Sequence, residues 1–184
     1  MEWGTALGIV RSLHARGGVA HVVVDETRPL LQGARITATE LAAEGIDHHV
    51  VVDGAAPSII ARGLVDAVVV GADRVAANGD VANKIGTYPL ALAAARAGIP
   101  FVVAIPESTF DPDTPDGAAI EIEERAGDEV LVVNGRRTAP PRSAAWNPAF
   151  DVTPADLVTA VVTEERVWRP ASTAAPASAG RRSG

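Results

Sequence analysis

The chain of 184 residues contains no cysteine and fewer basic than acidic side chains. Without cysteine it cannot form a disulfide, bind a metal through thiolates or supply a cysteine nucleophile. Its 16 Lys and Arg against 23 Asp and Glu give a net charge of −7, and the basic residues are scattered, which argues against nucleic acid or an anionic membrane as partner. No apolar run approaches the roughly 18 residues of a membrane span, and no signal-peptide pattern opens the chain. We therefore expect a soluble cytoplasmic protein.

The composition changes once, close to the end of the chain. From Arg169 the sequence reads RPASTAAPASAGRRSG, which is rich in small residues and proline and has no large apolar side chain. Such a segment cannot offset its ordering entropy by burial. The pattern predicts one folded domain, residues 1–168, followed by a disordered tail, residues 169–184.

Valine-rich runs alternate with helical patterns through the folded part. The runs are continuously apolar, which indicates strands buried on both faces of a parallel sheet. Strands are predicted at residues 19–24, 50–52, 67–70, 101–105 and 130–133. Helices are predicted at residues 6–13 and 34–42, from near Thr87 to Ala97 because Pro89 disfavours an earlier start, and from 154 to about 163. This alternation predicts an α/β fold with an open, doubly wound, mostly parallel sheet.

Polar residues gather directly after the predicted strands, where open α/β sheets bind ligands. Residues 71–84 provide a carboxylate, Asp73, at a strand exit and a Lys behind an amide at the far end. An Asp shielded from water has a raised pKa and can serve as general acid or base. The alternative, that Asp73 caps its loop or pairs with Arg74, remains equally open at this level.

A second polar segment, residues 25–35, contains Arg28, Gln32 and Arg35. A planar guanidinium beside a helix start suits a phosphate group. The alternative is surface solvation with an internal pair between Asp25 and Arg28. Glycine-rich dinucleotide and nucleotide loops and the nucleophile elbow of hydrolases are absent. The adjacent His48 and His49 would point to opposite faces of a strand, so we expect no metal and no cofactor.

Four stretches of the sequence resemble the methylthioribose-1-phosphate isomerases. They read VVVDETRPLLQGARITATEL, VVVGADRVAANGDVANKIGTYPLAL, AGIPFVVAIPESTFD and NPAFDVTPADLVTAVVTE. The wider family also contains ribose-1,5-bisphosphate isomerases and the regulatory subunits of a translation initiation factor's exchange complex. The GADR wording favours the isomerases within it. The resemblance covers nearly all of residues 3–164 and implies a Rossmann-like domain.

The resemblance assigns roles to individual residues. Asp73 of the GAD motif corresponds to the family's catalytic acid/base. Gln32 of LQGAR and the pair Asn83 and Lys84 of ANKIGT match substrate-binding positions, and Arg28 is a supporting candidate in the loop of Gln32. The implied reaction is the aldose–ketose conversion of 5-methylthioribose 1-phosphate to 5-methylthioribulose 1-phosphate in methionine salvage, without a metal.

The resemblance also predicts what this chain lacks. The family carries a helical amino-terminal domain and a catalytic cysteine ahead of the segment matched here, so we expect the chain to correspond to the carboxyl-terminal half. The missing half would then be encoded upstream or separately, and the isolated chain would have little or no isomerase activity. A non-catalytic sugar-phosphate-binding or regulatory domain, a ribose-1,5-bisphosphate isomerase and a poorly folding fragment remain as alternatives. The partners implied are a phosphorylated pentose and a second copy of the chain in a homodimer.

Overall fold

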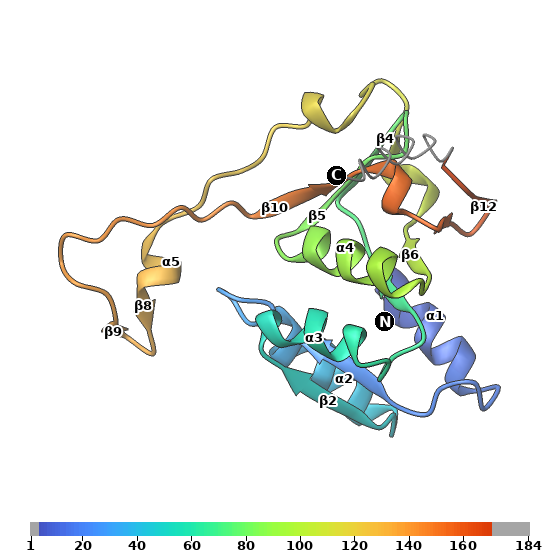
Figure 1. The fold of residues 1–184 in the computed structure, drawn as a ribbon, viewed down its shortest axis with the longest axis horizontal. Helices are drawn as coiled ribbons and strands as arrows, with labels where there is room; N and C mark the ends of the chain where they lie inside the picture. The colour runs from blue at the N-terminus through green and yellow to red at the C-terminus, as the bar shows by residue number, and fades with distance from the viewer. Residues whose placement is uncertain (1–3, 171–184) are drawn as a thin grey trace, which may run out of the picture.

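The computed structural model describes residues 4–170 and shows an α/β body from which one long segment projects (Figure 1). At the centre of the body, β3 (Val68–Val70), β6 (Phe101–Ala104) and β11 (Ala160–Val162) run parallel, and β12 (Val167–Trp168) adds an antiparallel edge. A second parallel pair joins β1 (Val22–Asp25) to β2 (His48–Val51). The predicted α/β class is confirmed, with parallel strands in the central sheet and in the pair of β1 and β2.

Four helices of these residues pack around the strands. They are α1 (Thr5–His14), α2 (Ala38–Ala43), α3 (Ala56–Ala61) and α4 (Thr87–Ala97), with a π-helical turn, η1 (Gly33–Thr37), leading into α2. Phe101, Val103 and Val161 of the central strands pack with Ala91 and Ala94 of α4 in the main hydrophobic core. Burial of these side chains is what holds helix and sheet together.

A second sheet carries the GADR and ANKIGT motifs. Its order is β10-β5-β4-β7, with β4 (Arg74–Ala76) and β5 (Val81–Lys84) forming an antiparallel hairpin between β7 (Phe110–Asp111) and β10 (Phe150–Thr153). The sequence pattern did not predict these short strands.

The projecting segment, which we call the arm, comprises residues 121–149 and follows the short 3₁₀ turns η3 (Glu107–Thr109) and η4 (Gly117–Ala119). It contains one helical turn, α5 (Asp128–Leu131), and a hairpin of β8 (Val132–Val133) and β9 (Arg136–Arg137). A bridge between Glu124 and Pro148 closes its base.

Most predicted elements are confirmed to within a few residues, and two are wrong. Residues 130–133 are not a strand of the parallel sheet, because they lie in the arm, away from the apolar partners that would bury such a strand. The helix predicted from 154 to 163 is only the 3₁₀ turn η5 (Ala155–Leu157), since the following residues pair with β6 as β11. Tertiary pairing has overridden the local capping signal.

The predicted carboxyl-terminal tail, residues 169–184, lies largely outside the described part of the chain. Of the predicted tail, only Arg169 and Pro170 belong to the described residues, and Pro170 is buried beside Gly79. Residues 171–184 lie outside the described part. Within residues 4–170 no helix is long and apolar enough to cross a membrane.

The carboxylate of Asp80, at the turn between β4 and β5, connects three distant segments. It accepts hydrogen bonds from Asn78 Nδ2 (2.9 Å), from the backbone N–H of Gly117 (2.8 Å) and from that of Ala155 (2.8 Å). Partial burial alone would raise the pKa of Asp80, but these hydrogen bonds outweigh it and hold the pKa below its usual range. The ionised carboxylate thus fixes the hairpin turn to η4 and η5.

We predict that Asp80→Asn lowers the free energy of unfolding at pH 7 by about 1–3 kcal/mol, because an amide presents one acceptor oxygen to three donors. The pKa of Asp80 is depressed on folding, so this stabilisation is present above its unfolded pKa and is lost as the pH falls through the folded value. Urea unfolding followed by circular dichroism at pH 7 and in acid measures both effects. The exposed Asp156→Asn serves as control, and equal stability of Asp80→Asn and wild type at pH 7 would contradict the assignment.

Candidate functional site

The loop after β1 is held in an unusual backbone conformation by one carboxylate. Thr27 and Leu31 have positive φ angles of 61° and 58°, which non-glycine residues adopt only at a cost in energy. Asp53, after β2, accepts hydrogen bonds from the backbone N–H groups of Thr27 and Arg28, both at 2.7 Å. This clamp offsets the backbone strain and sets the course of the chain toward Gln32.

Gly33 allows the same loop to pack directly on β1. A Cβ atom at this position would lie 1.8 Å from the backbone oxygen of Asp25, well inside van der Waals contact. Only glycine permits so close an approach without moving the backbone. The glycine of the LQGAR motif therefore determines where Gln32 lies.

The hairpin of β4 and β5 places Asp73 beside the strand that carries Lys84. The backbone N–H of Asp73 donates to the oxygen of Ala82 (3.0 Å) at the start of the hairpin. Although Asp73 is exposed overall, loss of hydration around its carboxyl raises its pKa, and the charge of Lys84 opposes this rise. A carboxyl whose pKa is raised is better suited to general acid or base chemistry than a fully hydrated one. The alternative pair with Arg74 is not formed, since Arg74 binds Asp111.

Lys84 and Asn83 are held by Phe150 of the adjacent strand β10 and by Thr87 at the start of α4. Lys84 pairs with Phe150 of β10, and its Nζ atom lies 4.3 Å from the centre of that ring. Asn83 donates through Nδ2 to Thr87 Oγ1 (2.9 Å), which itself donates to the oxygen of Lys84 (2.7 Å). Both side chains are therefore oriented before any ligand binds.

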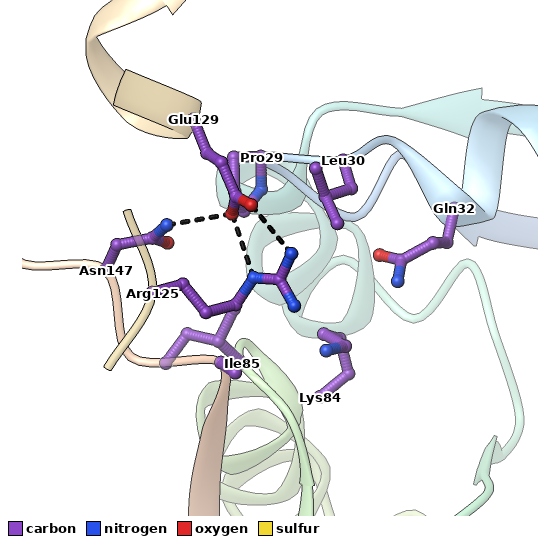
Figure 2. Close-up of a pocket in the computed structure, with 9 residues that line it drawn as sticks. Pro29, Leu30, Gln32, Lys84, Ile85, Arg125, Glu129 and Asn147 are labelled. Carbon is purple, nitrogen blue, oxygen red and sulfur yellow. Dashed lines mark hydrogen bonds and ion pairs between the residues drawn. The ribbon is translucent and has the colours of Figure 1, made fainter. Parts of the chain in front are cut away.

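A small, partly open pocket lies where the loop of Gln32, the end of β5 and the base of the arm meet (Figure 2). The side chains of Gln32 and Lys84 line it from one side and that of Arg125 from the other. The full lining is Pro29, Leu30, Gln32, Lys84, Ile85, Arg125, Glu129, Asn147 and Ala149. Of the residues proposed from the sequence, the pocket brings together Gln32 and Lys84. Asp73, Asn83 and Arg28 are not part of its lining.

Arg28 contacts the arm in the structure. Its guanidinium donates to the backbone oxygens of Pro29 (3.1 Å) and of Val130 (3.2 Å) in the arm. Among the described residues no ion pair joins Arg28 to Asp25. The arginine thus ties the loop of Gln32 to the arm.

The contribution of the arm to the pocket was not predicted from the sequence. Arg125 forms a bidentate ion pair with Glu129, in which Nε lies 2.9 Å and Nη2 lies 2.6 Å from the carboxylate oxygens. The buried Asn147 also donates to Glu129, at 3.0 Å. The i, i+4 spacing of Arg125 and Glu129 was a visible signal, but it indicates a helical salt bridge as readily as a site.

Asp25, at the carboxyl end of β1, titrates abnormally. Loss of hydration and the nearby charge of Asp53 raise the pKa of Asp25 to about 7. The carboxyl is therefore largely protonated in mildly acidic solution. Among the described residues no cluster of three or more His, Asp or Glu side chains is arranged to hold a metal ion.

We predict that Asp25→Asn stabilises the protein at pH 8 by about 1 kcal/mol or more, after allowance for solvent screening. The folded pKa lies above the unfolded one, so the folded state binds more protons between about pH 4 and pH 7, and wild-type stability falls as the pH rises through this window. Thermal melts across that range should show a flatter profile for the variant. The exposed Asp47→Asn is the control, and parallel profiles for Asp25→Asn and wild type would refute the assignment.

Comparison with known proteins relates this geometry to a family. The sequence model of the Initiation factor 2 subunit family matches residues 2–170. The Methylthioribose-1-phosphate isomerase of Parasynechococcus marenigrum is 58% identical over 167 residues, which cover 91% of this chain and 50% of the relative. A probable bifunctional methylthioribose-1-phosphate isomerase/methylthioribulose-1-phosphate dehydratase of Nocardia farcinica is 64% identical over 165 residues, 90% of this chain and 30% of that protein.

Solved structures give the same picture. The 5-methylthioribose 1-phosphate isomerase of Pyrococcus horikoshii superimposes with a TM-score of 0.89 at 45% identity, over 93% of this chain and 48% of that one. The delta subunit of translation initiation factor eIF-2B from A. fulgidus gives 0.87 at 44% identity, over 92% and 49%. The chain spans about half the length of most curated relatives it matches, namely their carboxyl-terminal portion. The family match over nearly the whole described chain and the shared fold lead to one conclusion: the protein belongs to the initiation factor 2 subunit family.

Proposed function

We propose that this chain carries the carboxyl-terminal half of an aldose–ketose isomerase that converts 5-methylthioribose 1-phosphate to 5-methylthioribulose 1-phosphate. The observation that supports it most directly is the meeting of Gln32 and Lys84 in one pocket, with Asp73 close enough to Lys84 for their charges to interact. These residues lie in the motifs by which the sequence resembles the isomerases, and the whole chain is 54–64% identical to relatives that carry this name.

In this proposal Asp73 is the acid and base of the reaction. The anomeric oxygen of the substrate carries the phosphate, so the ring opens only if an acid protonates the ring oxygen as its bond to C1 breaks. The hydrogen on C2 then moves to C1 by proton or hydride transfer, and the C2 hydroxyl loses its proton to become the ketone. No external oxidant is consumed. The raised pKa of Asp73 keeps a larger protonated fraction for the first step.

Other residues of the motifs hold the substrate, and an amino-terminal half completes the enzyme. Gln32, Lys84 and Asn83 hold the sugar phosphate, and Arg28 supports their loop through the arm. The family's catalytic cysteine is not among these 184 residues, so the isolated chain should turn over little substrate until an amino-terminal half is supplied, in the same or a separate chain. We also propose a homodimer, which sedimentation equilibrium would detect.

A regulatory sugar-phosphate-binding domain is the second candidate, because a structural neighbour of nearly equal similarity is an initiation-factor subunit. Both candidates predict binding of the sugar phosphate, and turnover separates them. Ribose 1,5-bisphosphate binding in preference to 5-methylthioribose 1-phosphate would instead indicate the bisphosphate isomerase.

We predict that a chimera, made by placing the amino-terminal half of the Parasynechococcus marenigrum relative ahead of this chain, isomerises 5-methylthioribose 1-phosphate. Asp73→Asn in that chimera should lower kcat by about 10²- to 10⁴-fold with a small change in KM, as expected for loss of a general acid or base. The exposed Asp66→Asn is the matched control. A folded chimera that binds substrate in calorimetry but shows no turnover would support the regulatory domain, and equal losses in kcat and affinity for Asp73→Asn would contradict its acid/base role.

A further inference from the structure

The pocket of Figure 2 concentrates positive charge in an acidic protein. Its lining contains two cations, Lys84 and Arg125, and one carboxylate, Glu129, whereas the whole chain has a net charge of −7. Charges in a small, partly dehydrated cavity attract an opposite charge more strongly than charges in open water. The pocket therefore favours an anionic group.

Arg125 retains donors that point away from its partner Glu129. A guanidinium has five N–H donors, and the ion pair uses two of them, the Nε–H and one N–H of Nη2. The other terminal nitrogen, Nη1, forms a longer ion pair with Glu123 Oε1 at 3.8 Å, which is beyond hydrogen-bonding distance. The side chain of Glu123 is 57% exposed. A second anion that takes the place of the exposed Glu123 carboxylate can approach this edge without breaking the pair with Glu129.

The position of Arg125 is fixed by the base of the arm. Its backbone N–H donates to the oxygen of Asn147 (3.0 Å), and the backbone N–H of Asn147 donates to Glu124. Asn147 is only 3% exposed, and its Nδ2 atom also binds the oxygen of Ala126 (3.0 Å). Hydrogen bonds from Arg125 and Asn147 lower the pKa of Glu129 to about 2, so Glu129 remains ionised and keeps hold of the guanidinium at neutral pH. A pre-organised arginine binds an anion with less loss of entropy than a mobile one.

We propose that Arg125 binds the phosphate group of the substrate from the arm, on the side of the pocket opposite Gln32 and Lys84. The inference rests on the proposed function and adds a binding residue to it. The planar fork of an arginine matches two phosphate oxygens, and Lys84 supplies a point charge on the other side.

Calorimetry with the chain and three ligands tests this inference: 5-methylthioribose 1-phosphate, 5-methylthioribose without phosphate, and inorganic phosphate. We predict that Arg125→Gln weakens binding of the phosphorylated sugar by at least about tenfold, the loss expected for a hydrogen bond to a charged group. Arg125→Lys should recover part of the affinity. Neither variant should change the affinity for the sugar without phosphate, and inorganic phosphate should compete with the phosphorylated sugar only in proteins that keep a cation at position 125.

The matched control is Arg137→Gln, which removes another arginine of the arm, paired with Asp128 and outside the pocket lining. Circular dichroism melts verify that each variant folds. If Arg125→Gln does not fold, Arg125→Lys is used for the binding measurement instead. Equal affinity of wild type and Arg125 variants for the phosphorylated sugar would overturn this inference alone. An equal loss for both sugars would also overturn it, because it would indicate only a structural role. A folded wild type that binds no phosphorylated sugar would overturn the proposed function, and with it this inference.

Discussion

The site depends on the hairpin of β4 and β5, and the hairpin depends on the carboxylate of Asp80. Because this carboxylate accepts hydrogen bonds from η4 and η5 as well as from its own turn, the hairpin cannot rotate independently of the central sheet. The start of the hairpin carries Asp73, and its end carries Lys84, so a single antiparallel register brings the two together. The Asp within AANGD is therefore a structural residue of a motif whose other acid has a chemical role in our proposal.

A second carboxylate performs the same task for the loop after β1. Asp53 holds the backbone of Thr27 and Arg28, and the close approach of Gly33 to Asp25 then determines the position of Gln32. Arg28 links this loop to the arm through Val130. The loop, the hairpin and the arm are thus mechanically connected, and the pocket lies at their junction. These connections are polar, and the hairpin is also anchored by Val75 and Val81, which belong to the main hydrophobic core.

The sequence predicted those parts of the protein whose structure follows from local pattern. Strands β1, β3 and β6 were visible because their sequences are continuous apolar runs, and Gly98 at a φ of 72° ends α4 as its sequence indicates. Gln32, Lys84 and Asp73 were selected because they follow strands or lie in recognisable motifs. Arg125 and Asn147 were not selected, because only long-range contacts bring the arm against the loop of Gln32. Residues 130–133 were misassigned for the same reason, since valines in a projecting hairpin look like valines in a buried strand.

The tight packing of Gly33 has a consequence for comparing members of this family. A charged residue of the pocket can be exchanged for another polar residue and leave a recognisable, weakened site. At Gly33 even one additional methyl group would collide with the backbone of β1, at 1.8 Å. Every single-base change in a glycine codon that alters the amino acid adds a side chain or stops translation. A relative that keeps this glycine can therefore pack the loop of Gln32 on β1 as this chain does, whereas a relative without it must move the loop.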